Sequence, residues 1–322
     1  MAARDHLGIV VDNNNRRVTL FDINTQEVLQ QLPLDADILD VAINSDCTRA
    51  FVTSFASMTM FQIDLCAMPA RVIASAVAST LLEDVALTPD GKFALSVDGS
   101  GSNQAIVSYS ARQNAFVSSL STSAQAVAVS PRSRELVLTA EYFNDSVHRF
   151  VIHPDGTLED SGQSFLTGTG PINIIFSPNG EFAFVAAQKD SSISVLGTLI
   201  PEDVVMLGSA PSSAGPQSLA ITRDGRHVFA LTASNVDIYA FDPVAGSLTL
   251  ERSFPHGLGI TSYFGVDQIT LDAGETKLFI SGNGRVAVFT TYGLSLGNVV
   301  GAAGPGGIAV CTCHSGHRNR DD

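Results

Sequence analysis

A short apolar segment followed by a turn recurs seven times along this 322-residue chain, and this repeat limits the fold more than any other feature. The first two copies, residues 40–46 and 84–90, read DVAINSD and DVALTPD. The seven copies begin at residues 40, 84, 126, 173, 218, 268 and 307. Repeats of roughly 40–50 residues are the period of four-stranded β-propeller blades.

Each repeat also contains the turns that a blade requires. Asp-Gly pairs follow the first apolar segment at residues 90–91 and 224–225. Because Gly adopts positive φ without steric cost, such a pair between two apolar runs indicates a hairpin. An alternating third segment such as 236–241 and a more polar fourth one such as 248–252 complete the unit.

The two ends of the chain supply complementary parts of one blade. Residues 7–11, 17–21 and 28–32 resemble the second, third and fourth strands of a blade, whereas the last repeat, 307–313, has no strands after it. Pairing these parts covers strand edges that would otherwise invite aggregation. We therefore predict an all-β, seven-bladed β-propeller with four antiparallel strands per blade, in which the C-terminal strand joins the N-terminal blade.

We assign residues 1–313 to this single propeller and residues 314–322 to a polar C-terminal tail. A long β-sandwich is the structural alternative, but it would not need matching half-repeats at opposite ends of the chain.

The charge of the chain limits its partners. Its 18 Lys and Arg against 32 Asp and Glu give a net charge of −14, which disfavours nucleic acid and anionic membranes. No apolar run reaches the roughly 18 residues of a membrane helix, and no signal peptide is visible. The four cysteines do not form the pattern of a disulfide framework. We expect a reduced, cytoplasmic monomer, or a secreted protein if the N-terminus has been processed.

The repeats resemble the YVTN-type β-propeller family, which residues 88–97 (TPDGKFALSV) and 18–23 (VTLFDI) illustrate. Residues 168–193 are also similar to the lactonase-like, or 6-phosphogluconolactonase-like, branch of these propellers. That branch typically carries an Arg-His pair and an Asn-Glu pair where this chain has Ile172-Asn173 and Ala187-Gln188. Gln cannot act as a general base and Ile cannot clamp a phosphate, so the resemblance supports the fold and counts against the activity.

Polar residues are expected at one rim of the central channel. In each blade, the loop before the first strand and the loop between the second and third strands reach this rim. Carboxylates and amides there could hold a hard cation or a polyhydroxylated or cationic ligand. Alternatively, they only hydrogen-bond strand ends and channel waters. The candidate ligand-binding residues are Asp12, Asp40, Asp84, Asp98, Glu141, Asn173, Gln188, Gln217, Asp267, His256 and Tyr263.

Two further segments carry chemistry. Residues 254–265 form a long loop in which His256 and Tyr263 could capture a ligand or contact a partner, or simply pack over a blade end. The only metal-like cluster is Cys311, Cys313, His314 and His317, whose soft ligands would favour zinc or copper. The cysteines can equally be small buried residues of the closing strand.

These observations favour a non-enzymatic ligand- or protein-binding propeller that uses the rim and mouth of its channel. Its partner would be another protein or a polar small molecule, and no cofactor is predicted beyond a divalent cation that the mouth could hold. The first alternative is a lactonase-like hydrolase or lyase acting on a sugar lactone or similar molecule, with a metal or carboxylate site at Asp40, Asp84, Glu141 and Asp267. The second alternative is a structural module of a surface assembly.

Overall fold

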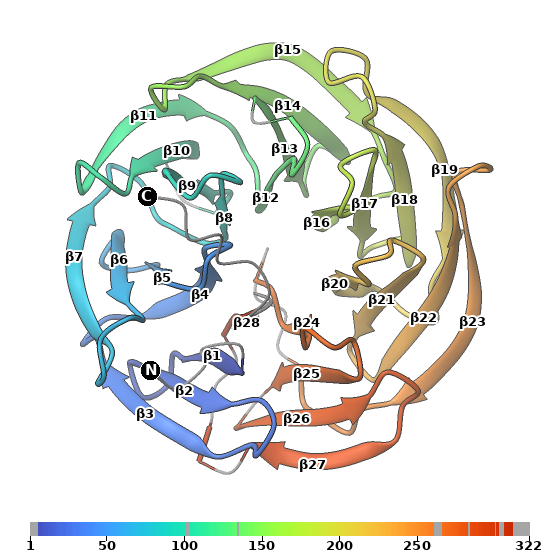
Figure 1. The fold of residues 1–322 in the computed structure, drawn as a ribbon. Helices are drawn as coiled ribbons and strands as arrows, with labels where there is room; N and C mark the ends of the chain where they lie inside the picture. Colours follow the sequence, from blue (N-terminus) through green and yellow to red (C-terminus); the bar gives the residue numbers. More distant parts are fainter. Residues whose placement is uncertain are drawn as a thin grey trace, which may run out of the picture.

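The computed structural model is a ring of seven sheets around a central axis (Figure 1). It describes residues 6–100, 103–133, 135–260, 266–282, 284–299, 301–302 and 306–311. Within these ranges the chain forms 28 strands and no helix, so no described helix could cross a membrane. The prediction of a seven-bladed β-propeller with four antiparallel strands per blade is confirmed.

The strands follow one another from the centre of the ring outward in each blade. The closing blade contains β28 (Ile308–Val310), β1 (Leu7–Asp12), β2 (Arg17–Asp22) and β3 (Val28–Pro33). The next three blades contain β4 (Ile38–Ile43), β5 (Arg49–Ser54), β6 (Thr59–Asp64) and β7 (Arg71–Val77); β8 (Val85–Leu87), β9 (Phe93–Asp98), β10 (Ala105–Ser110) and β11 (Ala115–Ser121); and β12 (Ala126–Val129), β13 (Leu136–Glu141), β14 (Ser146–Ile152) and β15 (Leu158–Leu166). The last three contain β16 (Pro171–Phe176), β17 (Phe182–Ala187), β18 (Ser192–Gly197) and β19 (Val205–Pro211); β20 (Pro216–Ile221), β21 (His227–Thr232), β22 (Asn235–Asp242) and β23 (Ser247–Pro255); and β24 (Ile269–Leu271), β25 (Lys277–Gly282), β26 (Arg285–Thr290) and β27 (Ser295–Val299).

The ring closes as the two half-repeats predict. Strand β28 pairs antiparallel with β1, with Ile308 opposite Val10 and Val310 opposite Gly8. The backbone N–H of Val11 also donates to the carbonyl oxygen of Gly307 at 2.9 Å. The inner edge of the N-terminal blade is therefore covered by the last strand of the chain.

The turn between the first two strands of a blade is fixed by local side chains. In the third blade, Gly91 has a φ of 65°, and its N–H donates to the carbonyl oxygen of Thr88 at 2.8 Å. The Thr88 hydroxyl donates to a carboxylate oxygen of Asp90 at 2.8 Å. The recurrent pattern of a hydroxyl residue, Asp or Asn, and Gly is thus the chemistry of this hairpin.

The core lies between neighbouring blades rather than at the centre of the ring. Leu95 and Ile106 of one blade pack with Val137 and Phe150 of the next, and all four are at most 1% exposed. Outer strands such as β7 are mostly exposed, whereas the inner strands leave room for a channel. The site described below lies in that channel.

Cys47 and Cys311 form a buried disulfide between residues 264 positions apart. Cys47 lies in the turn after β4, and Cys311 directly follows the closing strand β28. The bond therefore ties the end of β28 to the neighbouring blade. The expectation of reduced cysteines is wrong for this pair, because the two thiols meet only once the ring has closed.

Candidate active site

The innermost strand of each blade is an edge strand of its sheet and faces the centre of the ring (Figure 1). Such an edge presents backbone N–H and C=O groups that no further strand of the sheet covers. A cavity of about 410 Å³ runs along β4, β16, β20, β24 and β28. Asp267 lies at one end, and Arg223, Asp272 and Glu275 lie in turns at the other.

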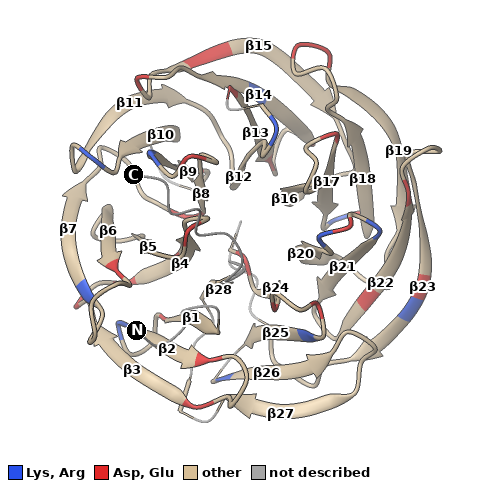
Figure 2. Cartoon of the chain, viewed as in Figure 1, with Lys and Arg blue, Asp and Glu red and all other residues tan. Residues whose placement is uncertain are grey.

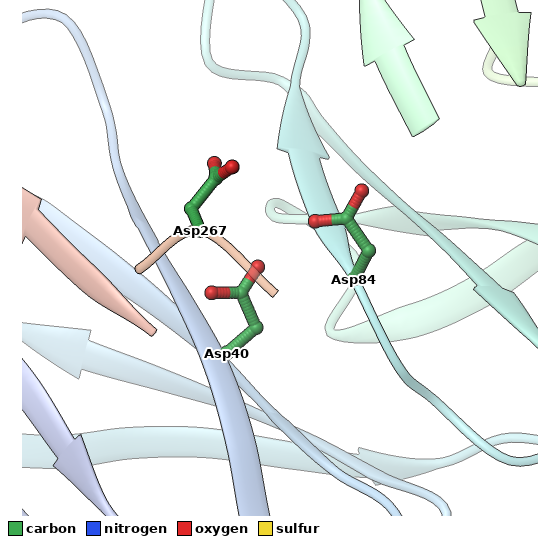
Figure 3. Close-up of side chains that lie close together, drawn as sticks. All are labelled: Asp40, Asp84 and Asp267. Atoms are coloured by element: carbon green, nitrogen blue, oxygen red, sulfur yellow. The ribbon is translucent and has the colours of Figure 1, made fainter. Parts of the chain in front are cut away.

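Three carboxylates meet at the Asp267 end of this cavity (Figure 3). Asp40 lies in β4, Asp84 directly precedes β8, and Asp267 lies two residues before β24. Oxygen atoms of the three side chains all lie within 4.8 Å of one another. Asp40 and Asp84 are buried, whereas Asp267 is partly exposed and lines the cavity. We call these three residues the aspartate cluster.

Two of the three aspartates also link neighbouring blades. Asp40 Oδ2 accepts a hydrogen bond from the N–H of Val85, at the start of the next inner strand, at 3.2 Å. Asp84 Oδ2 accepts in the same way from Val127, one blade further on, at 2.7 Å. Both residues open their copy of the repeat, so one repeat position supplies a hydrogen bond to the next blade.

Asn173 occupies the same repeat position and orients Asp267. The Asn173 Oδ1 accepts from the N–H of Leu219 at 3.1 Å, which fixes the direction of its amide. The Nδ2 group then donates to Asp267 Oδ1 at 3.0 Å. Asp267 therefore has one oxygen held by an amide, and this contact favours its ionised form.

Burial, the largest cause in each case, raises the pKa of all three carboxyl groups. Burial and then the charge of Asp267 raise the pKa of Asp40 to about 8. The pKa of Asp84 rises through burial and through the charges of Asp40 and Asp267. Burial raises the pKa of Asp267 to about 6, against the effect of the hydrogen bond from Asn173.

No Lys, Arg or His among the described residues forms an ion pair or hydrogen bond with the aspartate cluster. Asp40 Oδ1 is buried and accepts no hydrogen bond. Three neighbouring carboxyl groups, two of them buried, cannot all ionise at moderate cost without a positive partner. Asp267, the most accessible of the three and the one with an amide partner, is the group that ionises most readily.

The remaining acidic rim candidates lie apart from the cluster and hold loops of their own blades. Asp12 pairs with Arg17 at 3.1 Å. Asp98 accepts from the Thr80 hydroxyl at 2.6 Å. Glu141 accepts from the Thr122 hydroxyl at 2.9 Å, so it does not join the carboxylates with which the sequence grouped it.

The two glutamine candidates differ in their surroundings. Gln188 accepts from the Tyr142 hydroxyl at 3.3 Å and borders the loop between β17 and β18. Gln217 is buried at the start of β20, and its side-chain oxygen accepts no hydrogen bond. Neither belongs to the aspartate cluster.

His256 is a buried structural group. Its Nε2 donates to the carbonyl oxygen of Thr232 at 3.0 Å, while its Nδ1 accepts from the N–H of Leu258 at 3.1 Å. Burial lowers its pKa, so the neutral ring is favoured. Within the described part of loop 254–265 this histidine fixes backbone, which is the packing role left open by the sequence; Tyr263 lies outside the described residues.

Cys311 cannot supply a thiolate to the candidate metal cluster of cysteines and histidines near the C-terminus. Cys311 is bonded to Cys47, and a disulfide sulfur is not the thiolate that binds zinc. Cys313, His314 and His317 lie outside the described residues.

Sequence reasoning left Glu83 out of the site. Burial, as the largest cause, raises its pKa to about 7. Its Oε2 accepts from the N–H of Gly99 at 3.2 Å, so it caps a loop of its own blade beside Asp84. Its position, one residue before the repeat's opening aspartate, was the available signal.

No family model matches the chain. Among solved structures, a protein of unknown function from Desulfotomaculum acetoxidans is 39% identical, with a TM-score of 0.92 over 95% of this chain and 99% of that one. The periplasmic gluconolactonase PpgL of Pseudomonas aeruginosa superposes with a TM-score of 0.78 over 95% of this chain and 98% of that one, at 15% identity. At that identity the likeness shows the fold alone.

A 6-phosphogluconolactonase from an Enterobacter species is 28% identical over 140 residues, which cover 39% of this chain and 42% of that protein. The match thus spans less than half of the curated relative. Because these similar proteins are named as lactonases, they contradict our expectation of a non-enzymatic binding propeller and favour the lactonase-like alternative. The chain is thus a seven-bladed β-propeller that is similar in part of its sequence to a protein named as a 6-phosphogluconolactonase and in its fold to a gluconolactonase.

Proposed function

We propose that this protein is a lactonase-like hydrolase whose general base is Asp267. The observation that carries the proposal is a partly exposed carboxylate at the end of a cavity of about 410 Å³, beside two buried carboxyl groups. A pKa of about 6 makes Asp267 a stronger base than an ordinary aspartate, yet leaves it mostly ionised at neutral pH. The names of the similar lactonases support the same reaction class.

The reaction requires water and one proton carrier. Asp267 accepts a proton from a water molecule as its oxygen attacks the lactone carbonyl carbon. The ring C–O bond then breaks, and Asp267 returns the proton to the departing alkoxide, so the product is the open hydroxy acid. Asp40 and Asp84 act as positioning residues, because their uncharged forms spare Asp267 from two adjacent negative charges.

An assay of glucono-δ-lactone hydrolysis tests this proposal. The reaction is followed in a pH-stat, and the spontaneous rate is subtracted. We expect catalysis to fall as the pH drops through about 6, because Asp267 becomes protonated there. The substitution Asp267→Asn should reduce kcat at least roughly 100-fold, the usual contribution of a general base. The matched control is Asp242→Asn, which removes an exposed carboxylate at the end of β22.

Two results would contradict the proposal. The first is a wild-type rate equal to the spontaneous rate, and the second is an unchanged kcat in Asp267→Asn.

A chelator distinguishes the proton-based mechanism from a mechanism that uses a cation held in the channel mouth. We expect full activity in EDTA, whereas loss of activity that Ca²⁺ restores would assign the carboxylates to a metal.

A further inference from the structure

We infer that the lactone taken by this site is uncharged and polyhydroxylated, rather than phosphorylated or alkyl-substituted. This inference rests on the proposed function and adds the class of substrate. Two independent features carry it: the charges around the aspartate cluster, and the chemistry of the channel wall.

The charges around the aspartate cluster are mainly negative or neutral. Asp267 is accompanied by two further carboxyl groups and one amide, and no cation among the described residues contacts them. At the opposite end of the cavity, Arg223 is accompanied by Asp272 and Glu275, and the backbone N–H of Arg223 donates to the Glu275 carboxylate. Each end of the cavity therefore carries more carboxyl groups than cations, which disfavours a phosphate there.

Figure 2 shows the same balance on the ribbon, with acidic segments beside β4 and β24 near the centre of the ring. Lys189, in the loop after β17, is a cation on the rim that could in principle attract a phosphate. Its ammonium group lies 4.1 Å from the centre of the Tyr142 ring and donates to the Tyr142 carbonyl oxygen at 3.4 Å. Lys189 is thus held by its neighbours rather than directed at the aspartate cluster.

The channel wall supplies the second feature. Its strands β4, β16, β20, β24 and β28 are the inner edges of their sheets, so their backbone donors and acceptors alternate along the cavity. Between these groups lie aliphatic side chains such as Val41, Ile175 and Leu219. Uncharged donors and acceptors in alternation match hydroxyl groups, which both donate and accept. An alkyl chain would leave these backbone groups without partners, at a cost in affinity.

The test compares three probes on the wild-type protein: glucono-δ-lactone, its 6-phosphorylated form, and δ-valerolactone, which lacks hydroxyl groups. We expect kcat/KM for glucono-δ-lactone to exceed that of each other probe at least tenfold, with the phosphorylated form limited by repulsion and δ-valerolactone by unpaired backbone groups. The Asp267→Asn variant should lose activity on glucono-δ-lactone, which ties the preference to this site.

The other outcomes of this comparison contradict either the substrate class or the proposed function. Equal or higher kcat/KM for the phosphorylated lactone would overturn the inference while leaving the proposed hydrolase intact. If Lys189→Gln then removed that activity, the phosphate site would be on the rim. Equal kcat/KM for δ-valerolactone would overturn the polyhydroxylated part. Hydrolysis of none of the three probes above the spontaneous rate would refute the proposed function itself.

Discussion

Removing the disulfide between Cys47 and Cys311 should lower the thermal stability of the propeller without opening its ring. The bond closes a loop with a sequence separation of 264 residues. Chain entropy for a loop of that length corresponds to at most about 5–6 kcal/mol of stabilisation, and measured values for disulfides are usually about 2–4 kcal/mol. A chain of 322 residues unfolds with an entropy of about 0.7 kcal/mol/K. The melting temperature should therefore fall by about 3–8 °C.

Differential scanning calorimetry of the Cys47→Ala/Cys311→Ala variant measures this shift, with Cys66→Ala as the control because Cys66 is exposed and outside the bond. Wild-type protein refolded under reducing conditions should show a similar shift without deleted sulfur atoms. The variant should still fold, since β28 keeps its pairing with β1. A shift below about 1 °C in both forms would refute the reasoning. Because structural disulfides persist in oxidising compartments, we propose such a compartment in place of the cytoplasm.

Two further predictions concern the aspartate cluster. Asp40 has a pKa of about 8 in the folded protein and near 3.9 in the unfolded chain, so the folded state binds more protons between these values. The free energy of unfolding should thus fall as pH rises from about 4 to 8, by about 1.4 kcal/mol per pH unit for each retained proton. Urea titrations at pH 5 and 7.5 should show this slope in wild type and a smaller one in Asp40→Asn; a stability that rises with pH would contradict the assigned protonation. A Cβ atom at Gly307 would overlap Asp40 Oδ1, so Gly307→Ala should cost about 1–3 kcal/mol in the same assay. Gly208→Ala, where a Cβ meets nothing within 4 Å, should cost less than half as much, and equal losses would count against the contact.

The fold could be predicted because its determinants are local. The turn at Gly91 is specified by residues within a few positions of it, and the same chemistry recurs in each repeat that carries Asp-Gly or Asn-Gly. Ring closure followed from counting strands at the two ends, and the pairing of Ile308 with Val10 confirms it. The disulfide escaped prediction for the opposite reason. Cys47 and Cys311 lie in different repeats, and nothing near either residue indicates that closure brings them together.

The site could be predicted only in part. Asp40 and Asp84 open their repeats, so their place at the channel was expected from the sequence. Asp267 precedes the corresponding position, which is Gln268, by one residue. That shift matters, because Glu83 precedes Asp84 in the same way but caps its own blade through Gly99. Eleven rim candidates could not be reduced to three without knowing which side chains turn toward the channel and which toward a loop.

The aspartate cluster is explained by two roles that one repeat position combines. An oxygen of Asp40 or Asp84 accepts a hydrogen bond from an N–H of the next inner strand. The neutral side chain of Asn can make the same hydrogen bond, as Asn173 does. Linking blades therefore does not require carboxyl groups, and burying two of them costs stability whenever they ionise. Adjacent carboxyl groups do what amides cannot: they hold titratable protons near neutral pH beside a third carboxyl group. That third group is Asp267, whose accessible position at the cavity end makes the retained protons chemically useful. If Asp40→Asn left both the pH profile of hydrolysis and the activity unchanged, blade linking would be the whole role of this position.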